Sequence, residues 1–293
     1  MSTLLIGFDS AWSATNCGAI VGALSSSKGV LRALGPPQTA DYKDALRVIR
    51  NWQSGLRPTS TIILLDQPTI VGNASGQRPV ENIVASLVSR RYGGMQPANT
   101  SRKEMFGRNA PVWSFLEQFG GAADPLDSVP VRNQVFETYP VLAMIALGWT
   151  LRDSRVAGRL PKYNPQRKKT FLLSDWQYVC EKLSDQFKER RLNEIFQWLE
   201  TVRSNPSPRK TDQDNLDSCS CLLVALHLVE RKDCLMVGDW KTGYIIVPAS
   251  AGLRTELEVR CTLTGLVPSE WVRAVRLPEM PLASRVLATV SLL

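Results

Sequence analysis

Short apolar runs alternate with turn-rich polar stretches along the chain, and the spacing of the apolar residues changes from one stretch to the next. Near the N-terminus, runs separated by serine- and glycine-containing turns predict an antiparallel meander of three strands at 4–9, 18–23 and 29–34. Apolar residues then recur every three or four positions over 41–52, which predicts an amphipathic helix. The apolar run at 61–65 predicts a strand parallel to the first, since a helix crossover joins parallel neighbours.

The rest of the chain predicts helices separated by irregular segments. Residues 67–111 are rich in Gly, Pro, Asn and Ser and contain one predicted helix at 80–90. A loop region this long more often binds a ligand than supports the fold. Another central strand is expected at 133–137 and a short strand at 243–247, with mixed strand and coil beyond 249. The remaining predicted helices cover 113–119, 141–147, 175–191 with a continuation to 199, and a final helix at 211–229.

These elements predict an α/β fold with a mixed five-stranded sheet, in which an antiparallel meander is extended by parallel strands and flanked by helices. With 293 residues, of which 44% are hydrophobic, the chain can bury a full core without a disulfide or metal staple. We expect one domain over 1–249, with insertions at about 67–130 and 150–210, and a C-terminal extension at 250–293 to which the pattern assigns no fold.

Basic residues outnumber acidic ones, 35 to 27, so the net charge of +8 favours attraction to polyanions. One stretch, 155–169, is basic and contains no acid. It is typical of a polyanion contact or of a solvated loop. No apolar stretch approaches the roughly 18 to 20 residues that span a bilayer. Because Asp9 interrupts the first apolar run too early for a signal peptide, we expect a cytoplasmic protein with no membrane contact.

Acidic residues stand at the ends of several predicted strands. Asp9 follows Leu4 to Phe8, Asp66 follows Ile62 to Leu65, and Glu137 ends the strand at 133–137. Open α/β folds keep their chemistry at the ends of such strands. Either aspartate alone could be a turn residue, but two of them on neighbouring strands predict a pair of adjacent carboxylates.

Asp214 and Asp217 lie three residues apart at the start of the last predicted helix, so their side chains share one face. Asp214 could instead form a capping box with Thr211. Asp217 lies on the apolar face of the helix, where a carboxylate is costly to bury without a partner such as a cation. Clustered carboxylates repel one another unless divalent ions neutralise them, and hard oxygen ligands select Mg²⁺ or Mn²⁺.

Other kinds of site have little support. His227 is the only histidine and lies inside the last predicted helix, away from the face of Asp214 and Asp217, so we expect a structural role. A Ser-His-Asp hydrolase or a histidine-rich metal site is therefore not expected. The six cysteines form no CxxC pair, and no phosphate-binding GxxxxGK[ST] or GxGxxG motif follows a strand.

In combination, the meander with its leading acid, the crossover helix, the strand-end acid and the late helix with D-x-x-D resemble the RNase H-like superfamily, in the branch of RuvC-type resolvases. More closely, the chain resembles an uncharacterised domain-of-unknown-function family of predicted RNase H-like nucleases. The late motif ends in Ser218 where that family usually has alanine. The matching segments are, in order, Gly7-Phe8-Asp9, Leu65-Asp66-Gln67-Pro68, Arg78-Pro79-Val80-Glu81, Phe136-Glu137-Thr138-Tyr139-Pro140, Lys162-Tyr163, Asp214-Asn215-Leu216-Asp217-Ser218 and Gly243-Tyr244-Ile245-Ile246-Val247-Pro248.

The resemblance implies a phosphodiesterase that uses two Mg²⁺ or Mn²⁺ ions and acts on DNA or RNA. Asp9 would then bridge the two ions, and Asp66 and Asp217 would each complete one side. A further ligand, or a residue that orients water, would be Glu137 or Asp214. The implied phosphate and backbone contacts are Arg78, Lys162, Arg167, Lys168 and Lys169.

Two other classes fit part of the pattern. A non-catalytic nucleic-acid-binding or regulatory module could use the same fold and the same basic charge. An actin-like or sugar-kinase-like ATPase shares the strand order, but it needs glycine-rich phosphate loops, and here Asp9 leads into Ser10-Ala11-Trp12-Ser13. The choice between DNA and RNA and the oligomeric state remain open.

Overall fold

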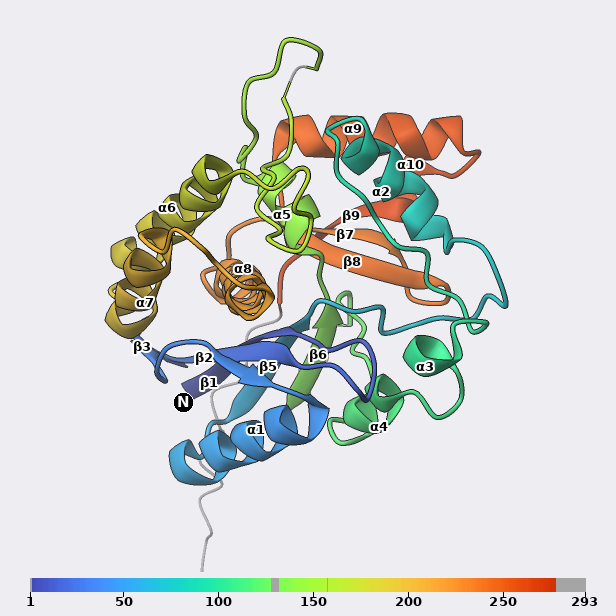
Figure 1. The fold of residues 1–293 in the computed structure, drawn as a ribbon. Helices are drawn as coiled ribbons and strands as arrows, with labels where there is room; N and C mark the ends of the chain where they lie inside the picture. Colours follow the sequence, from blue (N-terminus) through green and yellow to red (C-terminus); the bar gives the residue numbers. More distant parts are fainter. Residues whose placement is uncertain (1, 128–131, 157, 278–293) are drawn as a thin grey trace, which may run out of the picture.

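A mixed β-sheet forms the centre of the computed structural model, which describes residues 2–127, 132–156 and 158–277 (Figure 1). Its strand order is β3-β2-β1-β5-β6, with β4 also paired to β2. The meander and its parallel extension are confirmed, since β1 pairs antiparallel with β2 and parallel with β5, which pairs parallel with β6. The strands are β1 (Ser2–Asp9), β2 (Gly18–Ser26), β3 (Leu31–Ala33), β4 (Gln38–Ala40), β5 (Ser60–Leu65) and β6 (Asn133–Glu137).

The expected strand count of five was wrong, because within the described residues this sheet has six strands. The additional strand, β4, is only three residues long and forms where the chain passes back along β2 before the first helix. Three residues are too few to show an alternating pattern, so no periodicity marks this strand in the sequence.

Side chains alternate between two hydrophobic cores along the central strands. In β1, Leu4, Ile6 and Phe8 pack on the side of helices α1 (Tyr42–Leu56) and α4 (Pro111–Glu117). Leu5 points to the other side, into the core that contains much of the long helix α8 (Lys210–Val229). This period of two is the property of a strand buried on both faces. It places α8 on the side of the sheet opposite α1 (Figure 1).

Glycine at position 7 allows α8 to lie directly on β1. A Cβ atom at Gly7 would lie 2.1 Å from the Ser218 carbonyl oxygen and 2.3 Å from the Leu222 nitrogen. Both atoms belong to the helix backbone, which cannot move aside as a side chain could. The first strand and the helix with the D-x-x-D motif are therefore held at backbone contact.

A second sheet, of order β8-β7-β9, lies next to α8, on the same side of the first sheet as that helix (Figure 1). It consists of β7 (Cys234–Asp239), β8 (Gly243–Pro248) and β9 (Val272–Val275). Only β8 was expected. Thr138, just after β6, forms an isolated bridge to Ile246 of β8 and donates its hydroxyl to that residue's carbonyl oxygen, which links the two sheets.

The expectation of mixed strand and coil beyond 249 was wrong in its main element. Helix α9 (Ala251–Leu263) begins at an N-cap, Ser250, whose hydroxyl accepts from the Leu253 amide. It buries Leu253, Leu257 and Cys261, and α10 (Pro268–Trp271) and β9 follow. The predicted helix at 211–229 is therefore not the last one. The part of the 250–293 extension at 278–293 lies outside the described residues.

Most of the other helices cover the second sheet or the outer side of α8. They are α2 (Pro79–Ser89), α5 (Pro140–Ala146), α6 (Leu173–Glu189) and α7 (Asn193–Arg203). The short helix α3 (Lys103–Phe106) instead lies beside α4 (Figure 1). Among the residues that the structure describes, no helix is long and apolar enough to cross a bilayer.

Candidate active site

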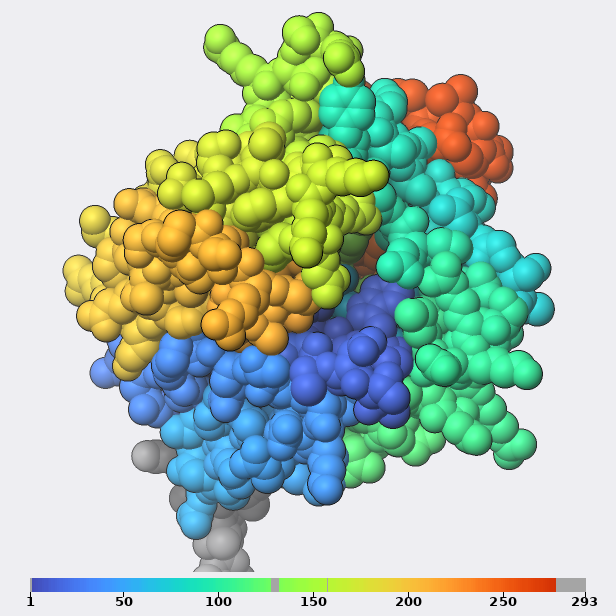
Figure 2. Space-filling view, in the orientation of Figure 1, coloured from blue at the N-terminus to red at the C-terminus, as the bar shows by residue number. Residues whose placement is uncertain are grey.

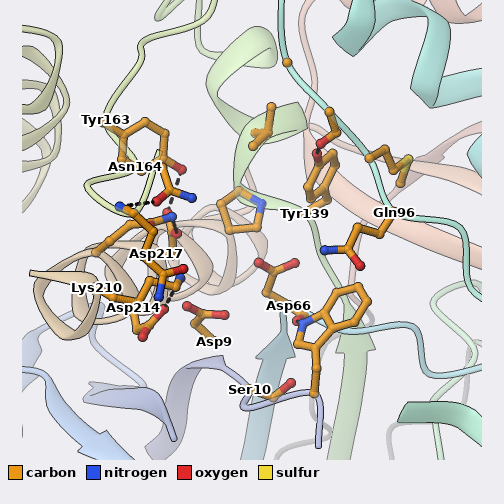
Figure 3. Close-up of a pocket in the computed structure, with 18 of the residues that line it drawn as sticks. Asp9, Ser10, Asp66, Gln96, Tyr139, Tyr163, Asn164, Lys210, Asp214 and Asp217 are labelled. Atoms are coloured by element: carbon orange, nitrogen blue, oxygen red, sulfur yellow. Dashed lines mark hydrogen bonds and ion pairs between the residues drawn. The ribbon is translucent and has the colours of Figure 1, made fainter. Parts of the chain in front are cut away.

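Four aspartates from three separate parts of the chain line one cavity of about 720 Å³. Asp9 is the last residue of β1, and Asp66 follows the last residue of its parallel neighbour β5. Asp214 and Asp217 come from the first turns of α8. Figure 3 shows these labelled side chains on the α8 side and floor of the cavity, with Tyr139 and Gln96 across from them. The predicted meeting of strand-end and helix acids is present.

The two strand ends are tied together by the residues that follow them. Ser10, which follows Asp9, donates a 2.5 Å hydrogen bond to the side-chain oxygen of Gln67, which follows Asp66. The Tyr42 hydroxyl donates to the same oxygen. The indole nitrogen of Trp12 donates to the carbonyl oxygen of Asp66 at 2.8 Å. These contacts fix the backbone at both acids, so the position of each carboxylate depends little on loop motion.

The helix acids have their own partners. The Tyr163 hydroxyl donates to Asp217 Oδ1 at 2.8 Å, and Gln213 Nε2 donates to Asp217 Oδ2 at 3.0 Å. The Lys210 ammonium forms an ion pair with Asp214 one turn away on the helix. The oxygen of the same side-chain amide, Gln213 Oε1, is buried and has no hydrogen-bond partner. The helix thus presents one carboxylate held by neutral donors and one held by a cation.

Burial and mutual repulsion raise the pKa values of these acids. Burial raises the pKa of Asp9 well above its usual value, and the neighbouring Asp66, Asp217 and Asp214 raise it further. The pKa of Asp66 is raised for the same reasons. Burial also raises the pKa of Asp217, to about 6, although Lys210 and the donors on its carboxylate oppose the shift. Negative charge in this cavity is therefore only partly compensated.

Glu137 occupies a different environment, although it also lines the cavity. Its two carboxylate oxygens accept from Arg78, at 2.6 and 2.9 Å, and the Thr69 amide donates to it at 3.0 Å. Arg78 is fully buried and also pairs with Glu81 at 2.8 Å. In the sheet Glu137 lies opposite Leu65, one position before Asp66. The structure therefore gives Glu137 a permanent counter-ion. Arg78, expected at a phosphate, lines the cavity and pairs with two carboxylates.

The basic segment divides into residues inside and outside the cavity. Lys162 and Arg167 are among the lining residues, whereas the exposed Lys168 and Lys169 are not. Asp175 of α6 anchors this segment. It forms an ion pair with Arg159 and accepts a hydrogen bond from the Lys162 amide. The anchored segment places Tyr163 and Lys162 over the cavity.

The donor set suits a hard divalent cation, because it is made of carboxylate oxygens with unbalanced charge and one unpaired amide oxygen. Over the part of the chain that the structure describes, no three Asp, Glu, His or Cys side chains are already grouped as metal ligands. The ammonium of Lys210 supplies part of the missing positive charge, and the carboxylates in turn raise its pKa against the effect of burial. The residues present therefore fit Mg²⁺ or Mn²⁺ by the chemistry of their donor atoms, and ligation would require the carboxylates to rearrange.

Three residues of the site were not identified from the sequence. Lys210 and Gln213 each lie four residues before an acid of α8, a spacing that places them on the same helix face, so the signal was present. Trp12 had no such signal, because a loop places it beside Asp66. His227, expected to be structural, is buried and does not line the cavity, and burial lowers its pKa to about 4.

Comparisons with known proteins give one result. A family model described as "Protein of unknown function (DUF429)" matches residues 7–239, a span that contains all four aspartates of the cavity. No curated protein and no solved structure matches the chain. Because the matched span covers most of the 293 residues, the chain belongs to the DUF429 family of proteins of unknown function.

Proposed function

We propose that this protein is a metal-dependent phosphodiesterase that cleaves nucleic acid, on an RNase H-like fold. One observation carries the proposal: Asp9, Asp66 and the two aspartates of α8 line a single cavity, with less positive charge than negative around them. Buried carboxylates at this spacing repel one another when no cation is bound, and the same carboxylates can bind divalent cations.

Asp9, Asp66 and Asp217 are the residues that would hold two divalent ions, with Asp214 as a further ligand. When bound, Mg²⁺ or Mn²⁺ would act as a Lewis acid toward a phosphate ester and would lower the pKa of a water molecule bound to the ion. The bond broken is a phosphorus–oxygen bond of a phosphodiester. Water supplies the hydroxyl group that the phosphorus gains, and the remaining proton goes to the departing oxygen.

Other residues of the cavity orient one of these carboxylates and attract the substrate. Tyr163 and Gln213 hold the two oxygens of Asp217, so that this carboxylate keeps one orientation. Lys162 and Arg167 put positive charge at the cavity, which favours approach of a polyanion. Glu137, with both oxygens on Arg78, supports the floor of the site and is not assigned to an ion.

The test is a cleavage assay with Mn²⁺ or Mg²⁺ on labelled single- and double-stranded DNA and RNA. We expect Asp9→Asn to lower the rate about 100-fold or more, since metal ions contribute several kcal/mol to such reactions. Asp44→Asn, which changes an exposed aspartate on α1, is the matched control and should keep the wild-type rate. Cleavage that Asp9→Asn leaves intact would come from a contaminant and would refute the proposal.

Ion binding can be measured separately from cleavage. At a free Mn²⁺ concentration of about 100 times its Kd, the free energy of unfolding should rise by about 3 kcal/mol. Asp9→Asn should lose most of this gain, and Asp44→Asn should retain it. Salt-sensitive nucleic-acid binding with neither metal stabilisation nor cleavage would identify a non-catalytic binding module instead.

A further inference from the structure

Resting on the function proposed above, we infer that the substrate is unpaired nucleic acid, with a base stacked against the aromatic wall of the cavity while its phosphate faces the aspartates. This wall is defined by Trp12, Tyr92 and Tyr139, all of which line the cavity. Figure 3 shows Tyr139 and Gln96 across the cavity from Asp214 and Asp217. Tyr139 therefore faces two of the acids across the cavity, and Trp12 lies beside a third, Asp66.

The backbone at Trp12 is unusual. Its φ is +58°, and the Ser13 amide donates to the Ala11 carbonyl oxygen at 2.7 Å, so Trp12 is the centre of a three-residue turn. The left-handed conformation is strained for a bulky residue, which keeps it only where the surrounding structure holds it there. Here the bond from the indole to Asp66 and the edge contact with Phe106, at 5.7 Å between centroids, hold it. These two contacts fix a large flat ring beside one of the acids.

The other non-glycine residues with positive φ among those the structure describes have an ordinary explanation. Arg57, Tyr92, Arg191 and Arg231 all lie just beyond the ends of helices, where the left-handed conformation is common. Trp12 alone in this set has no helix end to account for it. Outliers of this kind gather at functional sites, so the position of Trp12 points to a ligand that uses its ring.

Tyr92 adds a second ring at the cavity and keeps 38% of its surface exposed. The Lys162 ammonium lies 5.7 Å from the centroid of this ring and donates to the Tyr92 carbonyl oxygen. Two residues after Tyr92, Gly94 lies close to the guanidinium of Arg167. Aromatic rings beside cations are the combination with which proteins hold single strands, since rings stack on bases and cations follow the phosphates.

The shape of the cavity favours a single strand over a duplex. Its volume of about 720 Å³ is within the range of about 300 to 1,000 Å³ that small-ligand sites occupy. The aspartates at its floor are almost fully buried, Asp9 being 7% and Asp217 6% exposed. In Figure 2 the hollow opens between the N-terminal loop in dark blue, the green segment near residue 100 and the yellow-green segment near 165. A base inside a duplex is already stacked on both faces and cannot use the aromatic wall without leaving the helix.

The experiment measures binding in the Asp9→Asn background, where cleavage does not interfere. The probes are a single-stranded oligonucleotide that carries one 2-aminopurine and a hairpin of the same composition with that base paired. We expect the single strand to bind at least about tenfold more tightly, with quenching of the 2-aminopurine fluorescence as it stacks.

Variants of the exposed ring locate the contact. Tyr92→Ala should weaken single-strand binding about tenfold and reduce the quenching, and Tyr92→Phe should keep both. The matched control is Tyr178→Ala, which removes a tyrosine with a lysine 5.5 Å from its ring and no place in this cavity. It should bind as tightly as the Asp9→Asn parent.

Four outcomes of the binding measurements would overturn this inference. The first is equal affinity for hairpin and single strand. The second and third are a loss of affinity in Tyr178→Ala, or in Tyr92→Phe, that is as large as the loss in Tyr92→Ala. The fourth is a dinucleotide that binds as tightly as the oligonucleotide, which would indicate that the substrate is a small phosphodiester. The proposed function fails separately, when the wild-type protein cleaves nothing with Mn²⁺. Cleavage of duplex and single strand at equal rates would leave the nuclease and remove the preference.

Discussion

Two groups of buried acids lie side by side in this molecule, and they differ in their counter-ions, although burial also raises the pKa of Glu137 in the first group. Glu81 and Glu137 share Arg78, which gives each of them a hydrogen bond of 3.0 Å or shorter. Asp9 and Asp66 have no such arginine, and their pKa values are raised by burial and by neighbouring carboxylates. The ammonium of Lys210 is the cation that opposes those shifts.

The difference separates an acid that supports the fold from an acid that can react. A buried carboxylate with a complete set of partners has no capacity left for a ligand. A buried carboxylate that repels its neighbours gains from any cation that enters. Burial alone therefore does not identify a functional acid, and the balance of partners around it does.

The largest effect should come from removing the shared arginine. We expect Arg78→Met to lower the free energy of unfolding by about 3 to 5 kcal/mol, because it leaves two carboxylates buried without a counter-ion. The measurement is chemical denaturation at neutral pH. Arg47→Met, which breaks the exposed pair with Asp44 at 3.1 Å, is the control and should cost less than about 1 kcal/mol. Equal effects in both variants would mean that Arg78 does not compensate Glu81 and Glu137.

The dependence of stability on pH should distinguish the repelling acids. The folded-state pKa of Asp217 is about 6, above its ordinary 3.8, so the folded state holds the proton more tightly than the unfolded state. Metal-free protein should therefore lose stability as the pH rises from about 4 to 6, by up to about 3 kcal/mol from this group. Lys210 and Asp214 face the same space, but the raised pKa of Lys210 affects stability only at alkaline pH.

Asp217→Asn isolates this contribution. The variant should be more stable than wild type at pH 7.5 and no more stable at pH 4.5, as measured by denaturation without divalent ions. Asp44→Asn again serves as the exposed control. A difference between Asp217→Asn and wild type that is the same at both pH values would contradict the assignment of a raised pKa.

The smallest effect concerns the donors on Asp217. Tyr163→Phe removes the hydroxyl that donates to Oδ1 and keeps the buried ring, so we expect a loss of about 1 to 2 kcal/mol in stability. It should also weaken Mn²⁺ binding about 10-fold, because Asp217 would lose its fixed orientation. Calorimetric titration with Mn²⁺ checks this, with Tyr178→Phe as the control. Unchanged Mn²⁺ affinity would show that Tyr163 has only a structural role.

Local patterns in the sequence were enough for the centre of the fold and for most of the acids. Asp9 and Asp66 stand at the ends of apolar runs, and Asp217 lies on the apolar face of a helix. The pairing of Glu137 with Arg78 could not be predicted, because 59 residues separate them and a one-position offset in strand register removes Glu137 from the level of Asp66.

The second sheet and the C-terminal helix show two reasons for failure. Strand β9 has four residues, too few for a recognisable period, and its pairing with β7 is a long-range contact. Helix α9, in contrast, has Leu253, Leu257 and Cys261 at intervals of four after a serine N-cap, so its pattern was readable and was missed.

Gly7 has a consequence for any redesign of this protein. Because backbone contact between β1 and α8 fixes their separation, the gap between Asp9 and the aspartates of α8 cannot be narrowed by changes in side-chain size. Alanine at position 7 would instead widen that gap while leaving all four carboxylates unchanged. A larger ion such as Ca²⁺, which takes longer bonds to oxygen than Mg²⁺, offers a direct way to detect the altered spacing.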